Sequence, residues 1–291
     1  MDTPLSPDHD KIGDALKAQR FQMLEDIAKE LAGDIVFPTY FDAAFRLRKE
    51  LQNADLSLTQ LANRIAVEPL IAAKLLHLAN SVLYNPSGAT VRNLVGAIQR
   101  LGLEVVRSTA LTIAMGQMMR SRDLVEFADL TKSLWTHTLH TAAAAQVIAR
   151  RETRLNPDDA LLAGLVHDLG AFYMIYRAAK YPELRQRPDT LRYLIVQWHE
   201  GIGVSLLNAI GLPEEIVDAT IDHDQPRLLP ESIRTLPELI YVSNILAGGH
   251  FEWLYQDIDP EAGEPGLIRT RYAHLVDEIN TNTEEMQAVF D

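Results

Sequence analysis

The sequence predicts an all-α protein in which an N-terminal helical lobe packs on a second helical lobe. Apolar residues recur at helical spacing along most of the 291 residues, and no stretch of useful length alternates as a half-buried strand does. Proline, glycine and capping residues separate the periodic stretches. Because 47% of the residues are apolar, we expect a globular protein with a large core.

The N-terminal part divides into several helices. Ser57 can cap one of them, and Pro69 suits the first turn of another. Thr90 is a candidate cap for a longer helix, which Gly102 should end because glycine is common just after a helix C-terminus. The helices expected here span residues 14–31, 40–53, 60–66, 69–80 and about 90–101.

Longer helices are expected after Gly102. Asn156-Pro157 precedes one of them, and Leu212-Pro213 ends one helix and starts the next. Ser121-Arg122-Asp123 is the candidate boundary between the two lobes. The expected helices span residues 104–120, 123–129, 131–151, 158–168, 171–179, 189–208, 213–223 and 235–247.

Composition and charge exclude several classes of protein. The net charge of −13 argues against broad binding to nucleic acid. The chain has no cysteine, which excludes disulfides and thiolate metal ligands. Neither a signal peptide nor an apolar run of membrane-spanning length is apparent, so we expect a cytoplasmic protein with no membrane partner. From Tyr255 onward nine acidic residues outnumber two arginines, which predicts a solvated tail or an acidic interaction face.

The pair His167-Asp168 carries the most chemical information. It follows an apolar helical stretch and precedes Gly170, so an imidazole and a carboxylate can point at one cation. A single histidine is more often a surface or hydrogen-bonded core residue, but several in this order favour a metal site. Mixed imidazole and carboxylate ligands suit iron, manganese, zinc and nickel. The expected ligands are His137, His167, Asp168, His199 and His223, and His140, Asp224 and Asn244 are candidate additional site residues.

Two blocks of sequence resemble a known family. The first is Leu75-Leu76-His77-Leu78-Ala79-Asn80-Ser81, followed by Tyr84, Val91-Arg92-Asn93-Leu94 and Leu101-Gly102; the second is Ala163-Gly164-Leu165-Val166-His167-Asp168-Leu169-Gly170. With His137, His199 and His223 in order, the chain resembles the HD phosphohydrolase superfamily and, more closely, the HDOD family, the HD-related output domain of bacterial signalling proteins. The resemblance covers about residues 30–230.

The resemblance implies an N-terminal lobe packed on an HD-domain-like lobe, and a regulatory output role without an established common activity. It divides the chain into an N-terminal helical extension (residues 1–30), an HDOD module (31–235, with lobes 31–120 and 121–235), and C-terminal helices with an acidic tail (236–291). We expect Asn80 to hydrogen-bond to backbone at a turn. The expected core of the first lobe is Leu75, Leu76, Leu78, Leu94, Ile98 and Leu101.

Two positions depart from the catalytic relatives in this superfamily. Asn244 stands where HD hydrolases usually end their site with an aspartate, and an amide is a weaker, uncharged ligand. Ala171 stands where the cyclic-dinucleotide phosphodiesterase branch has a lysine. Asp224 is a candidate source of the carboxylate that Asn244 lacks.

Three functions remain open on the sequence. The first is a signalling output module without robust catalysis, which retains a metal, binds signalling proteins and is a candidate homodimer. The second is a metal-dependent phosphohydrolase or phosphodiesterase acting on a nucleotide or another phosphoester. The third is a ligand sensor that uses the same pocket. The retained ligand set favours the hydrolase and the ligand sensor, whereas the two departures favour the signalling output module. We expect the signalling output module.

Overall fold

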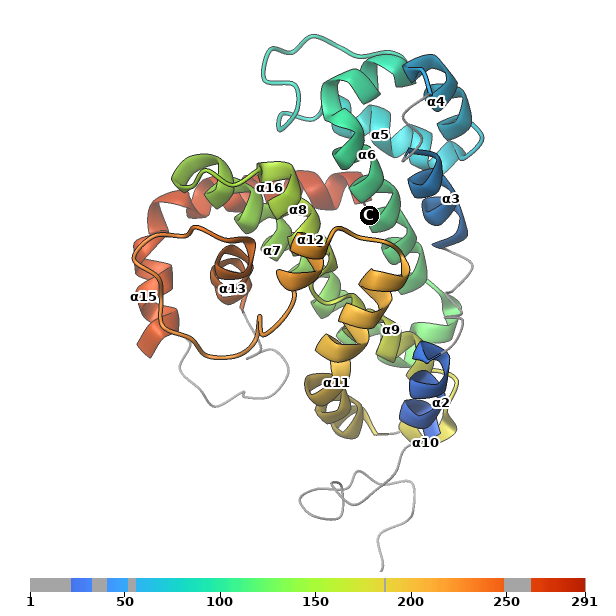
Figure 1. Ribbon diagram of the computed structural model, residues 1–291, viewed down its shortest axis with the longest axis vertical. Coiled ribbons are helices and arrows are strands. Elements are labelled where there is room, and N and C mark those ends of the chain that lie inside the picture. The colour runs from blue at the N-terminus through green and yellow to red at the C-terminus, as the bar shows by residue number, and fades with distance from the viewer. Residues whose placement is uncertain (1–21, 33–40, 52–55, 186, 249–262, 291) are drawn as a thin grey trace, which may run out of the picture.

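The computed structural model describes residues 22–32, 41–51, 56–185, 187–248 and 263–290. Within these ranges the chain forms helices, turns and loops and no strand, which confirms the all-α prediction. Figure 1 shows a smaller upper lobe and a larger lower lobe, and helix α6 runs from the first into the second. No helix within the described ranges is both long and apolar enough to cross a membrane.

The upper lobe packs three helices against α6. These helices are α3 (Asp42–Leu51), α4 (Leu58–Ile65), α5 (Pro69–Asn80) and α6 (Leu94–Met119). Ser57 caps α4 in a capping box with Gln60, as its position predicted in part. The cap of α6 is Asn93, whose side chain accepts the Gly96 N–H at 2.8 Å, so the assignment of this cap to Thr90 was wrong.

Gly102 breaks the long helix α6 into two segments. Its φ of 79° and ψ of 165° lie outside the helical region, and glycine adopts this positive φ without steric cost. The first segment belongs to the upper lobe, and the second carries a fully buried stretch from Thr109 to Gly116 into the lower lobe. The prediction that a helix ends at Gly102 is therefore confirmed, because the backbone leaves the helical conformation at this residue and a second helical segment begins after it.

Asn80 closes the turn between α5 and α6, as predicted. Its amide nitrogen donates to the carbonyls of Leu76 (2.8 Å) and Val91 (2.9 Å), and its oxygen accepts the Val91 N–H at 2.8 Å. The predicted core is confirmed except for two partly buried members: Leu75, Leu78, Ile98 and Leu101 are buried, whereas Leu76 and Leu94 pack at its edge.

The lower lobe is built around α7 (Ala128–Glu152). Helices α8 (Pro157–Val166) and α13 (Leu236–Leu246) pack against α7, while α9 (Leu169–Ala178) packs against α11 (Pro188–Ala209). Residues 142–145 of α7 are four fully buried alanines, and such small side chains allow close helix contacts. The lobe also contains η2 (Arg122–Phe127), α10 (Pro182–Arg185) and α12 (Glu214–Asp218).

The N-terminal helix α2 (Gln22–Leu31) packs on the lower lobe, beside α10 (Figure 1). Glu30 accepts hydrogen bonds from Tyr173 (2.9 Å) and from Arg177, both on α9. Tyr181 donates to Asp26 at 2.8 Å. The first part of the predicted extension, residues 1–21, lies outside the described residues.

The described part of the acidic C-terminal stretch, residues 263–290, is packed helix; residues 255–262 and 291 lie outside the described residues. The described part forms α15 (Gly263–Arg271), η3 (Ala273–Leu275) and α16 (Val276–Phe290), and α16 buries Ile279, Met286, Val289 and Phe290. The helix lies against both lobes: Glu285 accepts the Leu83 N–H at 3.0 Å, and Arg151 of α7 pairs with Glu278. Its acids occupy the outer face, while its apolar residues face the core.

Candidate metal centre

Four histidines and one aspartate converge inside the lower lobe. His137 lies on α7, His167 and Asp168 at the junction of α8 and α9, His199 on α11, and His223 in the turns after α12. All five are only 1–5% exposed. Every ligand predicted from the sequence is therefore in one buried cluster.

The histidine rings share one orientation. Nδ1 lies 2.8 Å from Gly164 O in His167, 2.8 Å from Ile195 O in His199 and 2.7 Å from Thr220 O in His223. In His137 it lies 3.3 Å from Ala247 O. A carbonyl only accepts hydrogen bonds, so each Nδ1 carries the proton in the neutral ring. Each Nε2 is then a bare acceptor directed at the centre of the cluster, the arrangement that metal-binding histidines use.

The two carboxylate oxygens of Asp168 face different pairs of rings. Oδ2 lies 3.2 Å from Nε2 of His167 and 3.7 Å from Nε2 of His137. Oδ1 lies 3.4 Å from Nε2 of His223 and 3.6 Å from Nε2 of His199. Within each triad the candidate ligand atoms lie within 4.8 Å of one another. The site is thus two half-sites that share Asp168.

The spacing between the ring nitrogens fits metal ligation. Nε2 of His137 lies 3.2 Å from Nε2 of His167, and Nε2 of His199 lies 3.3 Å from that of His223. Atoms that ligate one ion at about 2.1 Å stand roughly 3.0–3.4 Å apart. In their neutral form these nitrogens are acceptors facing acceptors, which is unfavourable unless a cation or proton lies between them.

Burial and neighbouring charges shift the pKa values of several members of the cluster. Burial lowers the pKa of His137 to about 4, helped by the neighbouring His167. Burial also opposes charge on His223, but Asp224 and Asp168 outweigh it and raise the pKa of His223 to about 10. Burial raises the pKa of Asp168, yet His167 and His223 hold that pKa well below its usual value. Without a metal, one proton on His223 offsets part of the buried negative charge.

Asp224 lies at the second half-site. Its Oδ2 is 3.5 Å from Nε2 of His199 and 3.8 Å from Nε2 of His223. Asn244 of α13 donates to the other carboxylate oxygen at 2.8 Å and to the backbone carbonyl of His223 at 3.1 Å. Asn244 therefore orients Asp224 and the His223 turn through its amide nitrogen.

Two glycines bring the helices close enough to form the cluster. A Cβ on Gly164 of α8 would lie 2.6 Å from Cα of Ala142 on α7. A Cβ on Gly170 of α9 would lie 1.9 Å from the carbonyl oxygen of His199 on α11. Bare backbone at these two positions allows His137 to reach His167 and His199 to reach Asp168.

The structure separates one candidate from the rest. His140 lies on α7 three residues beyond His137 but belongs to neither ligand triad. It is partly buried, and its pKa is lowered by burial and by the nearby positive charge of Arg269. Two residues that are three apart lie on the same broad side of a helix, but their side chains point in directions roughly 60° apart around the helix axis. His140 therefore lies outside both ligand triads, although it is on the same helix as His137.

Sequence reasoning missed one side chain and four backbone carbonyls that contact the cluster. The Thr141 hydroxyl lies 3.4 Å from Nε2 of His137, and its spacing of four from that residue was an available signal. The carbonyls of Gly164, Ile195, Thr220 and Ala247 orient the four rings, and backbone contacts leave no residue-type signal. Ala171, the second departure from the catalytic pattern, is fully buried.

The fold and this histidine–aspartate cluster define an HD-type helical protein. The model of the HDOD domain matches residues 37–226. The chain therefore belongs to the HDOD family, as the resemblance predicted. No curated protein matches the sequence.

Solved structures share the fold. A "putative metal-dependent phosphohydrolase" from Shewanella amazonensis SB2B is 24% identical, with a TM-score of 0.72 over 93% of this chain and 98% of that one. An HDOD domain protein of unknown function from Geobacter sulfurreducens is 20% identical, with a TM-score of 0.57 over 90% and 97%. A "putative signal transduction protein" from Marinobacter aquaeolei VT8 is 20% identical, with a TM-score of 0.53 over 94% and 64%. At these identities the likeness concerns the fold alone.

Proposed function

We propose that this protein is a signalling output module of the HDOD type whose lower lobe is held together by a buried transition-metal centre. The observation that supports it best is the common orientation of four rings, each with Nδ1 on a backbone carbonyl and Nε2 toward Asp168. Five acceptors converge there, and a divalent cation satisfies them all at once.

The two half-sites differ in their donors. His199, His223, Asp224 and one oxygen of Asp168 provide two imidazoles and two carboxylates. His137, His167 and the other Asp168 oxygen provide one donor fewer. We expect the half-site with Asp224 to bind its ion more tightly, because the second carboxylate adds negative charge. Iron, manganese, zinc and nickel all suit this ligand set.

A centre of this kind couples metal occupancy to the conformation of the lobe. Its ligands come from α7, the α8–α9 junction, α11 and the turns after α12, so one centre crosslinks four parts of the chain. A metal ion that binds the folded state but not the unfolded state increases the free energy of unfolding. The increase grows with the logarithm of the metal concentration. The surfaces of α9 and α11 therefore differ between the metal-bound and metal-free protein, and signalling partners recognise that difference. A second copy of this chain is one candidate partner.

Metal analysis tests the proposal directly. The purified protein is titrated with Fe²⁺, Mn²⁺, Zn²⁺ and Ni²⁺, and bound metal is measured by plasma mass spectrometry. We expect binding to be lost in Asp168→Ala and halved in His137→Ala. His140→Gln is the matched control, because it removes a histidine from the same helix but outside the triads. A wild-type protein that binds none of these ions would refute the proposal.

Hydrolysis is the second candidate function, and Asp224 is the observation that favours it. Its carboxylate compensates in charge for Asn244, and its side chain is 18% exposed, against 6% or less for the five core ligands. A bound metal ion would supply Lewis-acid chemistry to a phosphate oxygen. Ala171 offers such a substrate no contact, because it is buried and apolar. We therefore expect slow turnover or none.

Assays on metal-loaded protein separate the two candidates. The panel consists of cyclic dinucleotides, nucleotides and a generic phosphodiester. Turnover that disappears in both His167→Ala and Asp168→Ala, and persists in His140→Gln, would establish the hydrolase. Metal binding without turnover supports the output module.

A further inference from the structure

A cavity at the junction of the two lobes lies outside the metal centre. It has a volume of about 390 Å³, and its walls come from the end of α6, from η2 and from the first turns of α7. Ligand pockets for small organic molecules begin at roughly 300 Å³. The cavity is thus large enough for a molecule with one or two rings.

The walls combine apolar surface with positive charge. Met119, Leu124, Val125 and Trp135 supply the apolar part, and Val125 is 71% exposed at the rim. Arg120 and Lys132 are the charged residues of the lining, and none of its members is acidic. This is unusual in a chain of net charge −13. Glu126 of the same segment pairs with Arg185 at 3.5 Å.

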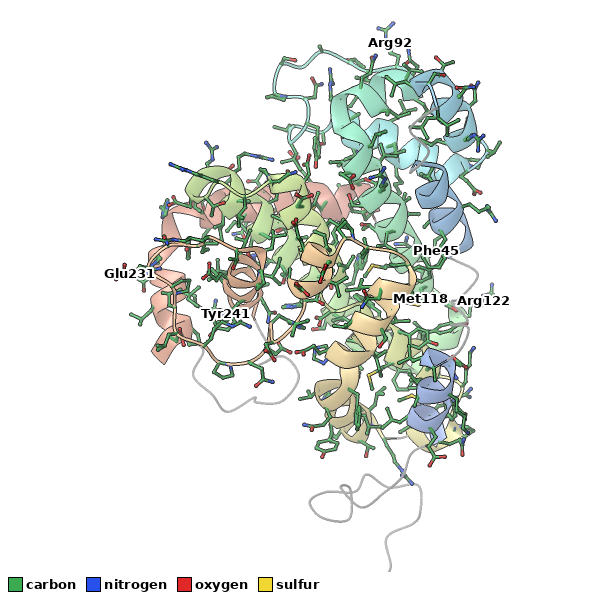
Figure 2. The ribbon with its side chains drawn as sticks, in the orientation of Figure 1. Phe45, Arg92, Met118, Arg122, Glu231 and Tyr241 are labelled. Atoms are coloured by element: carbon green, nitrogen blue, oxygen red, sulfur yellow. The ribbon has the colours of Figure 1, made fainter. Side chains whose placement is uncertain are left out.

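The two cations differ in their existing contacts. Nη1 of Arg120 donates to the Phe290 carbonyl at 3.1 Å, which ties the cavity wall to the end of α16. Lys132 is exposed and has no ion-pair partner among the described residues. A lysine ammonium at the mouth of an apolar cavity is therefore available to a ligand. Figure 2 shows Arg122, at the start of η2, projecting outward near the same junction.

Trp135 provides a flat surface within the cavity. A Cβ on Gly116 would lie 3.1 Å from Nη2 of Arg120 and 3.5 Å from the Trp135 ring, so the absence of a side chain there lets the Arg120 guanidinium lie beside the ring edge. The ring also meets Phe172 of α9 edge-on, with 6.2 Å between centroids and 79° between planes. Aromatic pairs favour this kind of offset or edge-to-face contact.

We propose that this cavity binds a small organic anion, whose ring packs against Trp135 and whose phosphate or carboxylate contacts Lys132 and Arg120. Trp135 lies two residues before His137 on α7, and Phe172 lies four residues after Asp168 on α9. The ligand would therefore contact α7, one of the helices that form the metal centre, and Trp135 connects it to Phe172 on a second such helix, α9. The proposal does not depend on a metal being bound.

Isothermal titration calorimetry with four probes tests the two parts of the ligand. Phenyl phosphate and benzoate carry a ring and a charge, inorganic phosphate carries only the charge, and benzyl alcohol only the ring. We expect a ring-bearing anion to bind at least tenfold more tightly than inorganic phosphate or benzyl alcohol. The better of phenyl phosphate and benzoate identifies the preferred head group. Equal binding of benzyl alcohol would overturn the proposal.

Three variants locate the bound anion. Lys132→Gln should weaken binding about tenfold, because a charge-assisted hydrogen bond is lost. Arg92→Gln is the matched control: it removes one positive charge from the upper lobe (Figure 2), away from the cavity lining, and should leave affinity unchanged. Ala128→Phe fills the cavity from an exposed position and should abolish binding. An affinity that survives both Lys132→Gln and Ala128→Phe would place the anion elsewhere and refute the site.

Discussion

Replacing Gly170 by alanine should both destabilise the protein and empty the metal centre. The new Cβ would lie 1.9 Å from the His199 carbonyl oxygen and 2.6 Å from the Gly203 nitrogen. Both neighbours are backbone atoms of α11, so no side-chain rotation relieves the clash. Cβ atoms essentially never approach other heavy atoms within 3.0 Å, so α11 must move away from α9 by about 1 Å.

The magnitude follows from this displacement. Overpacking a tight contact typically costs about 1–3 kcal/mol, and a clash against rigid backbone belongs at the upper end of that range. The same movement carries His199 away from Asp168, its partner in the second half-site. Disturbing the groups that orient metal ligands commonly lowers metal affinity about 10–100-fold.

Gly201→Ala is the matched control on α11. A Cβ at this exposed position meets no atom within 4 Å, and alanine is favoured over glycine inside a helix by about 0.4–1 kcal/mol. Urea unfolding of metal-free protein should therefore show opposite signs for the two variants, and metal titration should show a loss only for Gly170→Ala. Equal stability and equal metal affinity of the two variants would refute the packing argument.

Three further predictions concern the upper lobe and the charge of the cluster. Ile98→Ala should cost about 2–5 kcal/mol in urea unfolding because Ile98 is buried, whereas Leu94→Ala should cost about half of that because Leu94 is partly exposed; equal losses would contradict this. Asn80→Ala removes two hydrogen bonds that link α5 to Val91 and one to Leu76 within α5, and should cost about 2–3 kcal/mol; a change below about 0.5 kcal/mol would show that the turn holds without them. The folded-state pKa of His223, about 10, exceeds its unfolded value of 6.5, so protonation stabilises metal-free protein fully below pH 6.5, and this stability is lost as pH rises through 10. Since metal must displace that proton, apparent metal affinity should rise about tenfold per pH unit between pH 7 and 9; a flat profile would show that His223 binds metal without releasing a proton.

The helices were predictable because their signals are local. Ser57 accepts from its own first turn, Pro69 begins α5 and Gly102 breaks α6, and each of these effects depends on a few neighbouring residues. The error at the start of α6 has the same cause. Thr90 and Asn93 are both good capping residues, and only the hydrogen bonds of Val91 to Asn80 decide that the helix begins at the later one.

The cluster was predictable as a set of residues but not as a geometry. The order of His137, His167-Asp168, His199 and His223 indicated the ligands, because these residue types have few other reasons to recur at such helix positions. Their division into two triads depends on how the two oxygens of Asp168 are turned, and nothing in the sequence specifies that. The packing of α2 on α9 through Glu30 and Arg177 could not be predicted from the sequence either, because 147 residues separate these two partners.

Asn244 shows why one altered position does not determine the charge of a site. The sequence indicates a lost aspartate, and from that loss alone weaker metal binding follows. In the fold the amide of Asn244 donates to Asp224, whose free oxygen faces His199 and His223. An aspartate at position 244 would instead set two carboxylates against each other at hydrogen-bonding distance, and one of them would then take up a proton. Asparagine at 244 thus allows Asp224 to stay ionised: burial raises the pKa of Asp224, but the charges of His223 and His199, and then the hydrogen bond from Asn244, lower it below its usual value. The cluster thus keeps two carboxylates beside four imidazoles, a set of groups that suits a divalent cation. The position that holds a ligand in the catalytic relatives holds a residue here that orients the carboxylate of Asp224.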